Sequence, residues 1–143
     1  MQDLLADSRI FQWAGIGFGE QESYRLQKSI KKLAEKTQAS DIKFFGKILG
    51  SKQDYYIVEA TVEGGDDEEE GAEGQEEEEK GPEFEVKGTG VNKFTYFVAS
   101  SSLSDWKKLP DLSPTDLAAA RQIKVSFTGE LDRNIYTNPF FFG

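Results

Sequence analysis

Two short runs of alternating apolar and polar residues, 41–49 and 55–63, form the clearest pattern along the chain. They flank the sequence GSKQD at 50–54, whose residues favour a turn, so the pattern predicts a β-hairpin. In the second run every other residue is apolar, giving one unbroken apolar face made of Tyr56, Val58, Ala60 and Val62. A strand that is apolar on one side and mixed on the other is typical of an antiparallel sheet with one covered face.

The other predicted strands follow the same alternation. In the first run one face carries Ile42, Phe44, Gly46 and Ile48, and the other carries Lys43, Phe45, Lys47 and Leu49. Residues 91–99 predict a third strand, with Phe94, Tyr96 and Val98 on one face and Lys93, Thr95 and Phe97 on the other. Residues 105–109 predict a short strand or extended stretch anchored by Trp106.

One face of this sheet is expected to lie under helices of the chain, yet large side chains also occupy the opposite face. These side chains are candidate interface residues: Phe45, Leu49, Tyr55, Ile57 and Phe97. Two interpretations stay open at this point. The second face binds a partner, including a second copy of the chain as a homodimer, or the N-terminal segment of the domain covers it.

Apolar residues at helical spacing predict two amphipathic helices. The first covers residues 20–37, and the second begins at Pro114, with Ser113 as its N-cap, and continues to 124 or 126. Residues 1–13 have a looser helical spacing and predict a short helix that docks on the core. The predicted fold class is therefore α+β: a small antiparallel sheet, made of the hairpin and a third strand, packed with two amphipathic helices in a single domain over residues 1–143.

Most of the charge of the chain lies in one stretch. The formal net charge is −9, but residues 64–86 hold twelve acidic residues and one lysine, so the rest of the chain carries +2. Such a stretch has too little apolar surface to offset the entropy lost on ordering. Residues 64–87 are therefore predicted to be a long disordered acidic loop. It is either a solubilising spacer or an acidic tract that binds, or acts as a chaperone for, a basic partner.

The chain has no histidine and no cysteine, which narrows the possible functions. Nucleophilic triads usually need a histidine base and zinc sites need histidine or cysteine, so we expect no enzyme, catalytic residue, metal or cofactor.

The glycine-rich segment 14–19 precedes two glutamates that would repel a phosphate, and it predicts a turn. The lysine face of helix 20–37 lacks interleaved aromatics, so no nucleic acid is expected as a partner. No stretch has the ~20 apolar residues that cross a bilayer, so no membrane partner is expected.

Three consecutive phenylalanines, Phe140, Phe141 and Phe142, stand just before Gly143. Each would leave about 1.5–3 kcal/mol of burial unused if it were exposed. They are therefore candidate interface residues that cover the sheet or meet another chain. We expect the sequence to be the core fragment of a longer protein.

Several segments in order resemble the radial spoke head proteins of the 4/6 type. They are 44–50 (FFGKILG), 54–59 (DYYIVE), 88–98 (GTGVNKFTYFV), Trp106 with 108–110 (KLP), and 120–124 (ARQIK) leading to 127–129 (FTG). The stretch 11–26 and the acidic insert between the second and third segments resemble that family too. The ending at 138–143 departs from the proline-richer ending of the family, whose members continue well past this point.

The resemblance implies a non-catalytic structural or scaffold subunit of the radial spoke head in motile cilia and flagella. It implies a location in the cytoplasm, in the cytoskeleton of the axoneme. The implied partners are other radial spoke head subunits and the central apparatus. Since the family is not known for enzymes, it supplies no catalytic residues.

Overall fold

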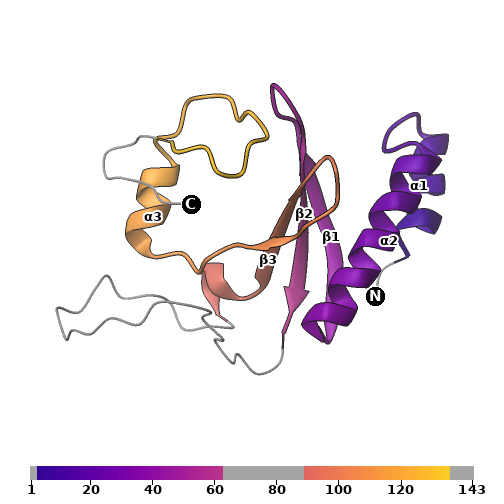
Figure 1. The fold of residues 1–143 in the computed structure, drawn as a ribbon, viewed down its shortest axis with the longest axis horizontal. Coiled ribbons are helices and arrows are strands. Elements are labelled where there is room, and N and C mark those ends of the chain that lie inside the picture. The colour runs from indigo at the N-terminus through magenta and orange to yellow at the C-terminus, as the bar shows by residue number, and fades with distance from the viewer. Residues whose placement is uncertain (1–2, 63–88, 136–143) are drawn as a thin grey trace.

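The computed structural model describes residues 3–62 and 89–135 of the chain (Figure 1). In this part, three α-helices accompany a four-stranded antiparallel sheet, and the predicted α+β fold is confirmed. The helices are α1 (Leu4–Trp13), α2 (Glu20–Thr37) and α3 (Pro114–Ala120), with a short 3₁₀-helix, η1, at Gly90–Asn92. The strands are β1 (Asp41–Ile48), β2 (Tyr55–Thr61), β3 (Thr95–Ser100) and β4 (Lys107–Lys108). The acidic stretch 64–87 and Phe140–142 lie outside the described residues.

The strand order is β1-β2-β3-β4, and every neighbouring pair is antiparallel. Helix α2 lies beside one face of the sheet, α1 packs against α2, and α3 lies at the opposite end of the molecule (Figure 1). We call the side toward α2 the helix face and the other side the open face. Because α1 packs against α2, the interpretation that the N-terminal segment covers the open face is wrong.

The core lies between α2 and the helix face. Leu26, Ile30 and Leu33 of α2 are buried against the sheet, together with Leu4, Ile42, Tyr56, Val58, Ala60 and Phe97. Gly19 is the N-cap of the helix, Glu20 and Glu22 lie in its first turn, and Gln38 is its C-cap in a left-handed conformation. Acidic residues near an N-terminus stabilise the helix dipole. The predicted bounds of this helix, 20–37, are confirmed.

The start of α3 is confirmed, and its predicted end is wrong. The Ser113 hydroxyl accepts a hydrogen bond from the Asp116 N–H at 3.2 Å, and the Asp116 carboxylate accepts one from the Ser113 N–H at 3.0 Å, which makes a capping box. The helix ends at Ala120, before the predicted 124 or 126. The β-branched residues Ile123 and Val125 follow, and such residues lose rotamer freedom in a helix.

A β-bulge at Phe45 corrects the predicted faces of β1. The register passes from Phe44 opposite Val58 directly to Gly46 opposite Ile57, so Phe45 has no partner residue. One extra residue reverses the inward and outward alternation of everything after it. Lys47 therefore lies on the helix face opposite Tyr56, and Ile48 lies on the open face opposite Tyr55, the reverse of the prediction.

The prediction that Phe97 lies on the open face is also wrong. Phe97 pairs with Val58 and is only 6% exposed, inside the core, while Val98 pairs with Ile57 on the open face. Alternation along a strand tells which side chains share a face, but it does not tell which of the two faces meets the helix. That choice depends on the register with β2, whose Val58 is fully buried.

The predicted strand at 105–109 exists as β4, and Trp106 anchors it as expected. The Trp106 indole N–H donates to the Ser29 hydroxyl at 2.8 Å, and that hydroxyl donates to the Leu103 carbonyl at 3.0 Å. These bonds join the loop between β3 and β4 to the middle of α2. The short strand β4 is thereby held at the edge of the sheet, paired with Phe97 and Val98 of β3.

Candidate interaction surface on the open face of the sheet

The tip of the hairpin is fastened to a segment far along the chain, residues 127–130, which we call the clamp segment. The Ser51 N–H donates to the Phe127 carbonyl at 2.9 Å, and the N–H groups of Lys52 and Gln53 donate to the Thr128 carbonyl at 2.9 and 3.1 Å. The Lys52 ammonium also pairs with the Glu130 carboxylate at 2.7 Å. Backbone bonds of this kind fix the clamp segment beside the turn.

Two glycines allow this close approach. A Cβ added at Gly129 would overlap the Gln53 carbonyl oxygen, and Gly129 has a φ of +97°, which side chains other than glycine rarely adopt. A Cβ added at Gly50 would lie 2.9 Å from the backbone nitrogen of Gly129. The Gly129 N–H donates to the Tyr55 hydroxyl at 2.7 Å. The backbone of the clamp segment therefore reaches the first residue of β2.

The clamp segment and the residues after it cover part of the open face. The ring of Phe127 meets the ring of Tyr55 edge to face, with centroids 6.1 Å apart. Between this cover and the sheet lies a groove of about 250 Å³. Its apolar lining consists of Ile48, Tyr55, Ile57, Val98, Leu109, Phe127, Leu131 and Ile135, and its charged lining of Lys107, Lys108, Glu130 and Arg133. An apolar floor with charged groups beside it is suited to another protein segment.

Beside the groove, one large apolar side chain of the open face remains in solvent, because Phe45 at the bulge is 62% exposed. Leu49, the residue after β1, is 75% exposed, but it follows the bulge, so the corrected alternation no longer places it on the open face. The Phe45 ring meets the Tyr96 ring edge to face at 5.5 Å, and the Tyr96 hydroxyl donates to Glu59 at 3.3 Å. Burial and the Glu59 carboxylate raise the pKa of Tyr96, so this hydroxyl stays protonated. Bulges often re-aim a side chain in this way.

The predicted interface residues thus divide into four groups. Phe45 and Leu49 are exposed, and Tyr55 and Ile57 are half-buried in the lining of the groove. Phe97 lies in the core, and Phe140, Phe141 and Phe142 lie outside the described residues. The alternation did not identify Ile48, because the bulge moved it. It did not identify Phe127, Leu131 and Ile135 either, because nothing local links them to the sheet.

On the helix face, the bulge places Lys47 inside a small charged network. Its ammonium pairs with Glu22 at 2.7 Å and Asp54 at 3.2 Å and lies over the rings of Phe18 and Tyr56. The Tyr56 hydroxyl donates a short hydrogen bond to the same Glu22 oxygen. Burial by itself would raise the pKa of Glu22, but the bonds from Lys47 and Tyr56 outweigh it, and the pKa lies below the ordinary 4.5. The bond to Glu22 raises the pKa of Lys47.

We expect Glu22→Gln to lower the free energy of unfolding at pH 7 by about 1–3 kcal/mol, because Lys47 would lose its charged partner. A carboxyl whose pKa is depressed by folding stabilises the fold above its unfolded pKa, and this contribution is lost as pH falls through the folded pKa. The difference between wild type and variant should therefore shrink between about pH 5 and pH 3. Urea unfolding at several pH values measures it. Glu35→Gln, on the exposed side of α2, is the control, and equal pH dependence in both variants would contradict the network.

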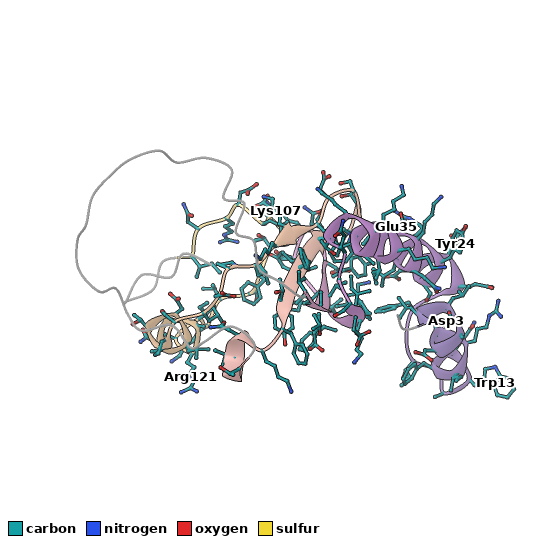
Figure 2. All side chains as sticks on the ribbon, turned by 90° about the horizontal axis from the view of Figure 1, so that it is seen from below. Asp3, Trp13, Tyr24, Glu35, Lys107 and Arg121 are labelled. Atoms are coloured by element: carbon teal, nitrogen blue, oxygen red, sulfur yellow. The ribbon has the colours of Figure 1, made fainter. Side chains whose placement is uncertain are left out.

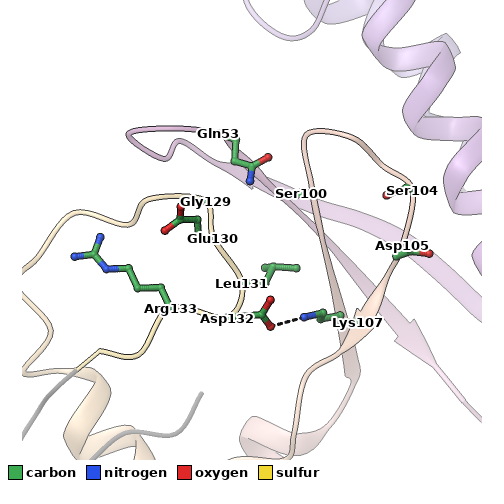
Figure 3. Close-up of a pocket in the computed structure, with 10 residues that line it drawn as sticks. All are labelled: Gln53, Ser100, Ser104, Asp105, Lys107, Gly129, Glu130, Leu131, Asp132 and Arg133. Atoms are coloured by element: carbon green, nitrogen blue, oxygen red, sulfur yellow. Dashed lines mark hydrogen bonds and ion pairs between the residues drawn. The ribbon is translucent and has the colours of Figure 1, made fainter.

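A larger, more polar pocket of about 560 Å³ adjoins the clamp segment, with Gly129 and Glu130 in its lining (Figure 3). Two of its charged residues pair with each other, since the Lys107 ammonium meets the Asp132 carboxylate at 2.6 Å. Ser100 and Ser104 supply hydroxyls, and each lies within hydrogen-bond distance of the Ser102 hydroxyl. Among the described residues no group of three or more histidine, cysteine or acidic side chains could hold a metal ion. Among the residues that the structure places, the hydroxyl partner of each of these two serines is a further serine and not a base.

A second apolar surface lies at the end of α1. Trp13 is 94% exposed and projects away from the rest of the molecule (Figure 2). Ile10, Phe11 and Ile16 are also exposed, and we call these four residues the α1 patch. Within the part of the chain that has been placed, no helix is long and apolar enough to cross a membrane.

Comparison with known proteins gives one consistent family. The family model described as radial spokehead-like protein matches residues 1–86 and 80–143. Radial spoke head protein 4 homolog A of Homo sapiens is 33% identical, over the whole chain and 23% of that protein. Radial spoke head protein 6 homolog A of Xenopus tropicalis is 35% identical, over the whole chain and 32% of that protein. Flagellar radial spoke protein 4 of Chlamydomonas reinhardtii is 31% identical, over 99% of the chain and 33% of that protein. The chain thus spans about a quarter to a third of the length of these relatives.

Proposed function

Because the chain belongs to the radial spokehead-like protein family, we propose that it is a non-catalytic structural subunit of the radial spoke head. Its place is then the axoneme of motile cilia and flagella, in keeping with the names of its relatives. It works by contacting other proteins. The absence of histidine and cysteine from the whole sequence supports a role without catalysis.

The partners are other radial spoke head subunits, and the open face is where one of them docks. The observation that carries this assignment is the exposed ring of Phe45, which lies against Tyr96 beside a groove with an apolar floor. An exposed apolar side chain beside such a groove is typical of a protein-binding site. A second copy of the chain and the central apparatus are further partners under this proposal.

Co-expression of the chain with a radial spoke head subunit, followed by co-purification, tests the proposal. We expect Phe45→Asp to weaken co-purification at least about tenfold, since a buried unpaired carboxylate costs more than the 1.4 kcal/mol that tenfold represents. The matched variant is Trp13→Asp, which makes the same change in a highly exposed side chain of the α1 patch. It should leave co-purification unchanged.

Two results would contradict parts of this assignment. Loss of co-purification with Trp13→Asp alone would move the docking site from the open face to the α1 patch. Retention with both variants would remove both apolar surfaces as docking sites. Sedimentation of the purified chain tests the homodimer separately, and a monomer over the whole concentration range would remove it.

A further inference from the structure

Five basic side chains gather on the outward side of α2: Arg25, Lys28, Lys31, Lys32 and Lys36. All five are exposed, while the apolar side of the same helix is buried in the core. We call this set the basic face. Arg25, Lys28, Lys32 and Lys36 recur every three or four residues, so they form one stripe that extends roughly 16 Å along the helix axis.

The charges of the basic face are not neutralised by ion pairs within the described part of the chain. Among the residues that the structure places, none of the five forms a salt bridge. In contrast, other basic residues do: Arg9, Lys43, Lys47, Lys52 and Lys107. The two acidic residues in the first turn of α2 are used elsewhere, because Glu20 pairs with Arg9 and Glu22 pairs with Lys47. Glu35 is the remaining acidic residue of the helix.

Such an arrangement is unfavourable in the isolated chain. Like charges four residues apart repel each other on a helix. This spacing occurs twice here, between Lys28 and Lys32 and between Lys32 and Lys36. An anionic partner that lies along the stripe relieves this repulsion and gains attraction from several charges at once. The face is therefore poised to bind negative charge.

We infer that the basic face binds an acidic segment of another protein. A membrane is a poorer fit, because a lipid-binding amphipathic helix inserts its apolar side and the apolar side of α2 is buried in the core. Nucleic acid is a poorer fit too, since four of the five cations are lysines and arginine is the residue that matches phosphate with two hydrogen bonds. A long polyanion would also meet the −9 charge of the whole chain, whereas a short acidic segment meets the stripe alone.

The experiment is a titration of a labelled oligoglutamate peptide with the whole chain, followed by fluorescence anisotropy at low salt. Lys28→Glu with Lys32→Glu should weaken binding at least about tenfold, and added salt should weaken binding to the wild type. The matched control is Arg121→Glu with Lys124→Glu, which changes the net charge equally at two exposed residues outside α2. It should change affinity less than about twofold. The α2 variant should stay folded by circular dichroism, because the glutamate introduced at position 32 would face Lys36 at a favourable spacing.

A chain lacking residues 65–81 is measured in parallel, so that competition from its own acidic stretch is removed. The inference is supported if either the whole chain or the shortened chain binds the peptide in a salt-dependent way and if this binding requires Lys28 and Lys32. Equal losses in the two charge variants, or no binding in either form, would overturn it. Tighter binding of a DNA duplex through the same lysines would overturn it in favour of nucleic acid. These outcomes are independent of the open face, so a failure here leaves the proposed docking of head subunits intact.

Discussion

Shortening Leu26 to alanine should lower the free energy of unfolding by about 2–5 kcal/mol. Leu26 is 0% exposed and lies at the centre of the contact between α2 and the sheet. The variant loses the transfer free energy of the removed methyl groups and leaves a cavity that neighbouring side chains fill only in part. Urea unfolding followed by circular dichroism measures the change.

The control for Leu26 is Lys32→Ala on the same helix. Lys32 is exposed, and alanine is a good helix former, so its effect should stay within about 0.5 kcal/mol. Equal stabilities of the two variants would mean that α2 does not carry the core. A loss in Leu26→Ala alone places the main stability of the domain at the helix face.

Replacing Gly129 with alanine should release the clamp segment from the hairpin tip. The left-handed backbone alone costs a residue other than glycine about 1–3 kcal/mol, and overlap of the new Cβ with the Gln53 carbonyl adds to it. The hydrogen bonds from Ser51, Lys52 and Gln53 to the clamp segment would then break. We expect faster hydrogen exchange at these three amides and new binding of a hydrophobic dye to the uncovered part of the open face.

Gly46→Ala is the matched control. It also adds a single Cβ to a glycine, but in β1, where nothing lies within 4 Å of the added atom. It should be neutral or slightly stabilising, because alanine restricts the unfolded chain more than glycine does. Unchanged exchange in Gly129→Ala would contradict the clamp. If release of the clamp also changed co-purification with a head subunit, the cover over the open face would be part of the docking site.

The two variants test two different sets of contacts, which we call the first and the second layer of this molecule. Leu26 belongs to a core that forms between elements close in sequence, with α2 followed directly by the hairpin. Gly129 belongs to a contact between segments whose hydrogen-bonded residues Tyr55 and Gly129 are 74 positions apart. The first layer holds the sheet together, and the second shapes the groove on its open face.

Much of the first layer could be read from the order of the residues. The spacing of Leu26, Ile30 and Leu33 predicts α2 with its observed bounds, since a period of 3.6 residues marks a helix with one buried side. The polar turn at 50–54 predicts the hairpin, and Ser113 with Asp116 predicts the start of α3, because both signals act within a few residues. The same local segments carried the resemblance to the radial spoke head family, which comparison confirmed.

The sequence by itself therefore determined the hairpin, the core helix and the family, whereas the tertiary structure decided which face each strand residue occupies. It also decided where β3 begins, at Thr95 after the 3₁₀-helix Gly90–Asn92 and not at 91 as predicted. Alternation is blind to a one-residue bulge, and the bulge at Phe45 moved Ile48 to the open face and Lys47 to the helix face. Alternation also does not tell which of the two faces of β3 meets the helix. The pairing of Phe97 with Val58 places Phe97 in the core. The cover from Phe127 to Ile135 depends on contacts between distant segments, which only a folded chain brings together.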